Sequence, residues 1–193
     1  EAARMNGLGA QVIKPPVLLK PADEWHPMFI TQINLSYDKG VDIFAHLAAR
    51  HSSHQFMGVK GGYSEQRVDF TDNVMVVEHT DDMNHVYNRT KVLVVPSRHE
   101  TYGKVVTEAM AWGIPVIASD LPGIREAGGD AVLYCDPTDY TAWHDTLHTV
   151  LEDQCTYDDL SLKSRDRAKH LAEQTHHDLA MWHGLVKHVV AHA

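Results

Sequence analysis

The chain has 193 residues, which suffices for one well-packed domain and is short for two, since typical domains run to about 100–200 residues. Hydrophobic residues make up 44% and charged residues 22%, as in an ordinary globular protein, and no apolar run approaches the roughly 20 residues that span a bilayer. The formal net charge of -9 opposes broad binding to nucleic acid, which requires clustered Lys and Arg. We therefore expect neither a transmembrane segment nor a nucleic-acid partner.

The N-terminal residues predict a partial first strand and a linker, together residues 1–22. Residues 11–13 form a short apolar run, and Pro15 and Pro16 soon after it would end a strand and stiffen the linker. Residues 1–4 contain no initiator Met and no apolar secretory core, so we expect an internal cut or a processed end there.

Six apolar runs further along the chain predict strands, at residues 28–35, 55–59, 74–77, 91–96, 114–118 and 131–134. Helical patterns alternate with them, at residues 41–48, 83–88, 103–112 and 139–151, and residues 158–193 are largely helical. Each step between parallel strands needs a crossover, which a helix fills. The alternation predicts an α/β fold, namely a doubly wound, Rossmann-like parallel sheet of about six strands over residues 23–156, followed by a C-terminal helical segment over residues 157–193.

Cysteine and histidine usage bears on compartment and metal binding. Cys135 and Cys155 are too few for a disulfide framework, and two unpaired thiols suit a reducing compartment, which predicts a cytoplasmic protein.

Among the 15 histidines, His188 and His192 would share one face of the C-terminal helix. Since no carboxylate or thiolate completes a ligand set beside them, we expect an exposed helix face rather than a metal site.

Two glutamates within residues 96–126 lie near the start of a predicted helix. Glu100 lies in the loop after a predicted strand and Glu108 about one and a half turns into the predicted helix, so both can face one pocket. The first amides of that helix form an anion site suited to a diphosphate, and Gly103 lets phosphate oxygens approach the backbone. Carboxylates beside phosphates repel them, unless the carboxylates accept hydrogen bonds from hydroxyls such as those of ribose and a hexose. The combination therefore suggests a pocket for a sugar nucleotide. The alternative is two surface acids near a helix start, which stabilise it by about 0.3–1 kcal/mol.

The same segment resembles the donor-site signature of the retaining glycosyltransferases of family 4 of the GT-B fold, the glycosyl transferases group 1. The resemblance extends, more weakly, from the prolines at 15 and 16 to residues 136–137, and it covers most of the chain as the C-terminal, donor-binding domain of such an enzyme. The residues that carry it are Pro96, Ser97, Glu100, Gly103, 108–111, Gly113, 115–119, Gly123 and Glu126.

The resemblance implies roles for the matched positions. Glu108 would bind the ribose hydroxyls and Glu100 the transferred sugar, while Lys39, followed by Gly40, would neutralise the diphosphate together with the first helix amides. Glu100 and Lys39 are therefore the expected catalytic residues. The base would pack after the third strand, where His79 is equally compatible with an ordinary loop. The expected donor-binding residues are Asn34, Lys39, Glu78, His79, Thr80, Ser97, Glu100, Thr101, Tyr102, Gly103, Lys104 and Glu108.

Asn34 departs from the family pattern. Much of the family has Gly-Arg five residues before the lysine, whereas this chain has Ile33 and Asn34, so the second cation expected for the phosphates is missing there. The Asn34 amide can still donate a hydrogen bond. We hypothesise that Lys60, Arg98 or Lys104 compensates, because all three fall in neighbouring strand-end loops.

The resemblance implies retaining transfer of a sugar from a nucleoside diphosphate to an acceptor hydroxyl, with no metal and no other cofactor. The acceptor would bind mainly to an N-terminal domain that this chain lacks, so we expect the chain to bind the nucleotide sugar and to show little transfer alone. The alternative is a non-catalytic sugar-nucleotide-binding or interaction module that acts with a partner chain, and a GT-B-like epimerase or phosphorylase would share the scaffold. A nicotinamide dehydrogenase is disfavoured because no predicted strand is followed by GxGxxG.

Overall fold

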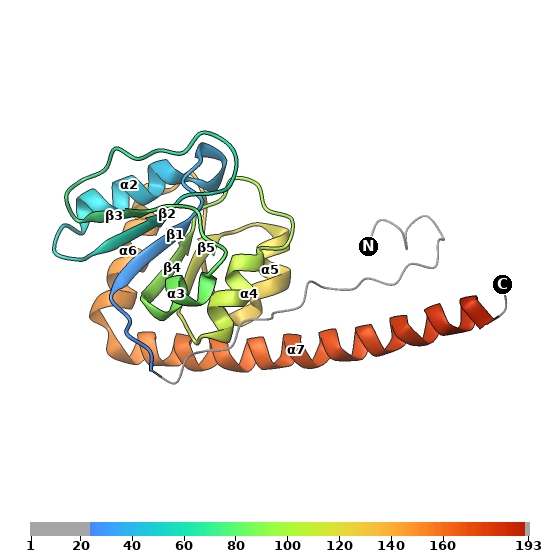
Figure 1. The fold of residues 1–193 in the computed structure, drawn as a ribbon. Coiled ribbons are helices and arrows are strands. Elements are labelled where there is room, and N and C mark those ends of the chain that lie inside the picture. Colours follow the sequence, from blue (N-terminus) through green and yellow to red (C-terminus); the bar gives the residue numbers. More distant parts are fainter. Residues whose placement is uncertain (1–23, 192–193) are drawn as a thin grey trace.

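The computed structural model describes residues 24–191, and a six-stranded sheet forms its centre (Figure 1). The sheet order is β3-β2-β1-β4-β5-β6, and each neighbouring pair of strands is parallel. The order reverses between β1 and β4, so the predicted doubly wound, Rossmann-like sheet is confirmed. The predicted strand at residues 11–13 lies outside the described residues. The strands are β1 (Phe29–Ile33), β2 (Phe56–Val59), β3 (Val74–Val77), β4 (Thr90–Val95), β5 (Val116–Ser119) and β6 (Val132–Cys135).

Helices fill most of the crossovers between the strands. The 3-10 turn η1 (Tyr37–Lys39) and α2 (Val41–Arg50) follow β1, α3 (Met83–Asn88) follows β3, and α4 (Lys104–Ala111) follows β4. The helix α5 (Pro122–Gly128) and the 3-10 turn η2 (Gly129–Ala131) join β5 to β6, and α6 (Tyr140–Glu152) follows β6. The helix α5 was not predicted from the sequence, because its 7 residues are too few to display a clear helical period.

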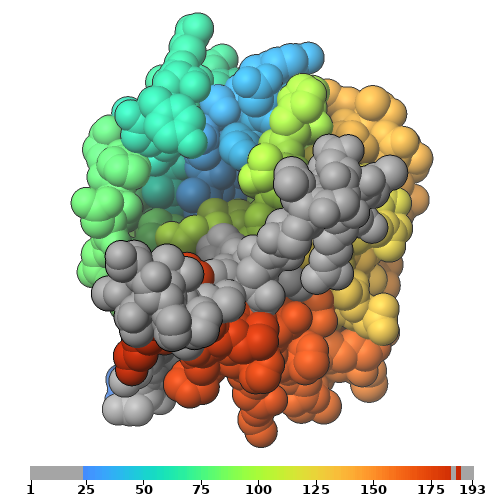
Figure 2. Space-filling view, turned by 90° about the vertical axis from the view of Figure 1, so that its right-hand side faces the viewer, coloured from blue at the N-terminus to red at the C-terminus, as the bar shows by residue number. Residues whose placement is uncertain are grey.

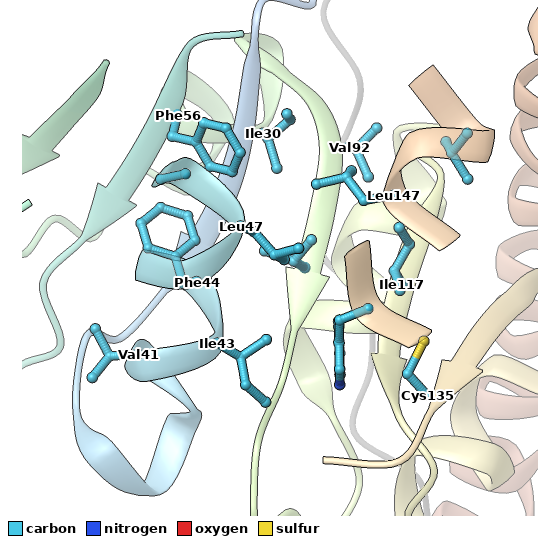
Figure 3. Close-up of a cluster of buried hydrophobic side chains, with 14 of the residues drawn as sticks. Ile30, Val41, Ile43, Phe44, Leu47, Phe56, Val92, Ile117, Cys135 and Leu147 are labelled. Carbon is cyan, nitrogen blue, oxygen red and sulfur yellow. The ribbon is translucent and has the colours of Figure 1, made fainter. Parts of the chain in front are cut away.

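Both faces of the sheet are buried, as its nearly continuous apolar strands require. On one face, Phe44 and Leu47 of α2 and Leu147 of α6 pack against Ile30 and Val92 of the strands (Figure 3). The helices α3, α4, α5 and α7 cover the other face. Their buried residues include Val86, Met110, Ile124 and Leu171.

The C-terminal helix α7 (Gln154–Ala191) is a single helix of 38 residues. Its first half packs on α4, α6 and η2. There the Ser161 hydroxyl donates to the Gly113 carbonyl oxygen at 2.7 Å, and the Arg167 guanidinium donates to the Ala127 carbonyl oxygen at 2.9 Å. Its second half runs past the body of the domain (Figure 1). Among the described residues, no helix combines the length and the apolar character that crossing a membrane requires.

Candidate functional site

A cavity of about 420 Å³ opens at the carboxyl ends of β1, β2, β3 and β4, beside the reversal of strand order. Parallel α/β sheets bind their ligands at this position. Figure 2 views the molecule from this side, where the surface is hollowed between the blue residues that follow β1 and the yellow-green residues that follow β4. The predicted donor-binding residues that line the cavity are Asn34, Lys39, His79, Thr80, Ser97, Glu100 and Lys104. Glu78, Thr101, Tyr102, Gly103 and Glu108 belong to the surrounding segments and not to the lining itself.

The turn after β1 fixes the position of Lys39. Gly40 has a left-handed conformation with φ of 73°, and a Cβ there would lie 2.0 Å from the Pro96 carbonyl oxygen, so the loop after β4 packs directly on this turn. The side-chain amide of Gln32, which is buried, donates to the carbonyl oxygens of Asn34 at 3.1 Å and Lys39 at 3.0 Å. Gln32, which positions the backbone of Lys39, was not predicted as a site residue.

The two predicted catalytic residues contact each other. Lys39 Nζ lies 2.7 Å from Glu100 Oε2 and 3.5 Å from the His99 carbonyl oxygen. The other carboxylate oxygen, Glu100 Oε1, accepts a hydrogen bond from the Thr101 backbone N–H at 3.1 Å. Partial burial acts to raise the pKa of Glu100, but the hydrogen bond and the charge of Lys39 outweigh it and hold that pKa below its usual 4.5. Glu100 is therefore ionised at neutral pH, and Lys39 and the backbone N–H groups of Thr101 and Gly103 stabilise its charge.

Glu108 is buried next to the cavity. Its residue is 6% exposed, its Oε2 accepts a hydrogen bond from the Tyr87 hydroxyl at 2.9 Å, and its Oε1 lies 3.1 Å from Lys104 Nζ. Burial and the charge of Glu108 hold the pKa of Tyr87 well above its usual 10.0, so the phenol remains a donor. Tyr87, fully buried on α3, was not predicted as a site residue, because nothing in the sequence around it indicates a carboxylate partner.

The N-terminus of α4 faces the cavity through Lys104 and Val105. Gly103, the residue before the helix, has φ of 76°, and no side chain caps the helix. The first amides of a helix have no acceptor within it, so they remain available to an anion. From the other side, α5 supports the preceding loop closely, because a Cβ on Gly123 would lie 2.1 Å from the Thr101 carbonyl oxygen.

The three cations proposed to replace the missing arginine are placed differently. Lys60 and Lys104 line the cavity, and Lys60 Nζ lies 2.7 Å from Glu78 Oε1. Arg98 is not in the lining; its guanidinium donates to both carboxylate oxygens of Asp42, at 2.9 and 2.8 Å. This bidentate pair joins the loop after β4 to α2. Because Arg98 does not line the cavity, Lys60 and Lys104 are the two of these cations that can complement Lys39.

Asn34 adopts a left-handed conformation, with φ of 68°, at the end of β1. Its Oδ1 accepts hydrogen bonds from the Ser36 backbone N–H and from Gln66 Nε2, both at 3.1 Å. Gln66 Oε1 in turn accepts from the backbone N–H groups of Leu35 at 2.7 Å and Gly61 at 2.8 Å. The Asn34 amide oxygen thus ties the loop after β2 to the end of β1, at the position where the family supplies a cation.

One end of the cavity is lined by aromatic and hydroxyl side chains. His79 and Thr80 follow β3, and Tyr63, which is 75% exposed, follows β2. A Cβ on Gly62 would lie 3.3 Å from His79 Nε2, so the imidazole lies close to the backbone of the β2 loop. Flat side chains of this kind suit a nucleobase.

Comparison with known proteins bears on this arrangement. The model of the family described as glycosyl transferases group 1 matches residues 27–174. The D-inositol 3-phosphate glycosyltransferase of Corynebacterium efficiens is 37% identical over 78 residues, which are 39% of this chain and 18% of that protein.

Solved structures share the fold. Sucrose-phosphate synthase from Thermosynechococcus elongatus matches with a TM-score of 0.76 and 24% identity, over 99% of this chain and 56% of that one. The Anabaena protein Alr3699/HepE, solved in complex with UDP-glucose, matches with a TM-score of 0.68 and 18% identity, over 80% of this chain and 49% of that one. The chain therefore spans about half the length of these two structures.

Proposed function

The chain belongs to the glycosyl transferases group 1 family, and from this premise we propose that it is the donor-binding domain of a retaining, family 4 glycosyltransferase of the GT-B fold. In this proposal the domain binds a nucleoside diphosphate sugar. The complete enzyme transfers the sugar to an acceptor hydroxyl, as a hexosyltransferase that uses neither a metal ion nor another cofactor.

One observation carries the proposal: Lys39 and Glu100 meet at 2.7 Å beside the uncapped N-terminus of α4. The ammonium and the helix amides suit a diphosphate, and the carboxylate suits sugar hydroxyls. Glu108, held by Tyr87, provides a second carboxylate for the ribose. The aromatic end of the cavity, with His79 and Tyr63, receives the base.

The proposed chemistry is electrostatic stabilisation of the leaving group. As the bond between sugar and diphosphate breaks, negative charge grows on the phosphate oxygens, and Lys39, Lys104 and the first amides of α4, which border the cavity, would stabilise it. Lys60 supplies the further cation at the end of β2, in place of the arginine that the family has at position 34. No carboxylate nucleophile is required in this scheme.

The acceptor site is proposed to lie mainly on a second, N-terminal domain. The chain spans 56% and 49% of the two structures it matches, which supports a role as the donor-binding part of a two-domain enzyme. We expect the chain to bind the donor and to transfer sugar poorly by itself. Robust turnover by the 193-residue chain would refute this part of the proposal.

Calorimetry with a panel of UDP, GDP and ADP sugars, repeated in the presence of EDTA, tests the proposal. We expect one base to be preferred and the affinity to be unchanged by the chelator. Glu108→Gln should weaken binding of the plain nucleoside diphosphate, because the ribose loses its acceptor. Glu100→Gln should chiefly weaken discrimination among sugars. Equal losses for the plain nucleoside diphosphate in both variants would contradict these assignments.

We also propose a cytoplasmic location. Cys135 and Cys155 are both free thiols, one buried and one exposed, which suits a reducing compartment. Fractionation of the native host, with detection of the protein in each fraction, tests this assignment.

A further inference from the structure

Three lysines of the cavity each contact a glutamate. The pairs are Lys39 with Glu100 at 2.7 Å, Lys60 with Glu78 at 2.7 Å, and Lys104 with Glu108 at 3.1 Å. Each lysine comes from a different strand-end segment, following β1, β2 and β4 respectively. The cations expected to hold phosphate thus already have carboxylate partners.

The Lys39–Glu100 pair is the most enclosed of the three. Its side chains are 27% and 17% exposed, whereas Glu78 is 81% exposed and Lys104 is 67% exposed. An ion pair that is shielded from water is screened less and competes more strongly with an incoming anion. Any phosphate that binds Lys39 must therefore compete with Glu100.

We propose that this competition makes the site select phosphates that carry a sugar over phosphates that do not. The proposal rests on the proposed donor-binding function. A sugar nucleotide brings hydroxyl donors that replace Lys39 at Glu100, and its diphosphate takes the released ammonium. Every charged group then keeps a partner. Inorganic diphosphate offers no hydroxyl donor. Either it takes Lys39 and leaves Glu100 unpaired beside a second anion, or Glu100 retains its ion pair with Lys39 and the diphosphate binds weakly.

The same competition favours release of the product. A nucleoside diphosphate that has lost its sugar still offers phosphate oxygens to Lys39, but it no longer offers hydroxyls to Glu100. The carboxylate, which the Thr101 N–H holds at 3.1 Å, lies in place to recover the ammonium. Glu100 thereby ties the affinity of the phosphate site to the presence of the sugar.

Glu100→Gln separates this selection from simple binding, because glutamine keeps the size of the side chain and removes its charge. Kd is measured by calorimetry at one ionic strength for inorganic diphosphate, for the preferred nucleoside diphosphate and for its sugar conjugate. We expect inorganic diphosphate and the nucleoside diphosphate to bind the Glu100→Gln variant about 3- to 10-fold more tightly than they bind the unchanged protein. The sugar conjugate should bind the variant about 3- to 10-fold more weakly. Glu173→Gln, an exposed site on α7, is the control for the same change in net charge and should alter none of the three.

Opposite signs for diphosphate and for sugar conjugate are the diagnostic result. If Glu100→Gln binds inorganic diphosphate and the nucleoside diphosphate no more tightly than the unchanged protein, the competition is refuted while donor binding stands. If the unchanged protein binds no member of the sugar-nucleotide panel, both the proposed donor binding and the proposed selection for sugar-bearing phosphates are refuted. A second test uses Lys39→Met, in which Glu100→Gln should bring no gain for diphosphate; a gain of the same size in that background would overturn the role of the pair.

Discussion

The hydrogen bond from Tyr87 to Glu108 leads to a quantitative prediction for Tyr87→Phe. The change removes one hydroxyl and leaves the ring, so it opens almost no cavity at this fully buried position. The lost bond is 2.9 Å long and its acceptor is a buried carboxylate. Hydrogen bonds to charged groups contribute about 1.5–3 kcal/mol, and we expect the free energy of unfolding to fall by that amount. Tyr134→Phe is the matched control; its hydroxyl donates to the uncharged Gly129 carbonyl oxygen at 2.8 Å, for which about 0.5–1.5 kcal/mol is expected.

A binding measurement distinguishes the positioning role of Tyr87 from a purely structural one. If Tyr87 orients Glu108 toward the ribose, Tyr87→Phe should raise Kd for the preferred nucleoside diphosphate by about 3- to 10-fold, as expected for about 1 kcal/mol. Kd for the 2′,3′-dideoxy analogue, which lacks the ribose hydroxyls, should rise much less. Equal increases for both ligands would refute the reasoning, since a general loss of stability does not distinguish between them. Urea denaturation and calorimetry supply the two measurements.

Three further predictions concern other parts of the domain. Gly123→Ala should destabilise the fold by about 1–3 kcal/mol and weaken donor binding, because the new Cβ would lie 2.1 Å from the Thr101 carbonyl oxygen; urea denaturation that matches the unchanged protein would contradict the close approach. Burial and neighbouring histidines lower the pKa of His51 to about 4, so below pH 6.5 the unfolded chain binds a proton that the folded chain does not. The free energy of unfolding should therefore fall by up to about 3 kcal/mol as the pH drops from 6.5 to about 4, and His51→Gln should reduce that slope. Asp42→Asn leaves the Arg98 guanidinium without its bidentate carboxylate, and thermal and urea unfolding should show a loss of about 1–3 kcal/mol, whereas an unchanged midpoint would mean that the pair contributes nothing.

Local patterns sufficed to predict the sheet and the edge of it at which the cavity lies. Apolar runs bounded by glycine, proline and polar turns marked the six strands, because parallel strands buried on both faces need nearly continuous apolar sequence. The cavity could be located because side chains that come directly after parallel strands gather at one edge. Lys39, Glu100 and Lys104, which follow strands or start a helix, lie in its lining.

Contacts between distant residues could not be predicted from the sequence. Tyr87 and Glu108 are separated by 21 positions and meet because α3 and α4 lie on the same face of the sheet. Gln32 looks like a polar interruption in a strand until the turn after β1 brings the Lys39 carbonyl oxygen to its amide. Arg98 resembled a phosphate ligand by position, and its pairing with Asp42 depends on the packing of α2 against the loop after β4.

The reversal of strand order between β1 and β4 has a thermodynamic consequence. Lys39 and Lys60 belong to the β3-β2-β1 half of the sheet, and Glu100 and Lys104 to the β4-β5-β6 half. A molecule held by all four joins the two halves, and ligand that binds the native state raises the free energy of its opening. If the domain binds a nucleotide sugar as proposed, amide hydrogen exchange should slow in β2 and in β5 together when that ligand is added, because the ligand would then act as a cross-link between two parts of one sheet.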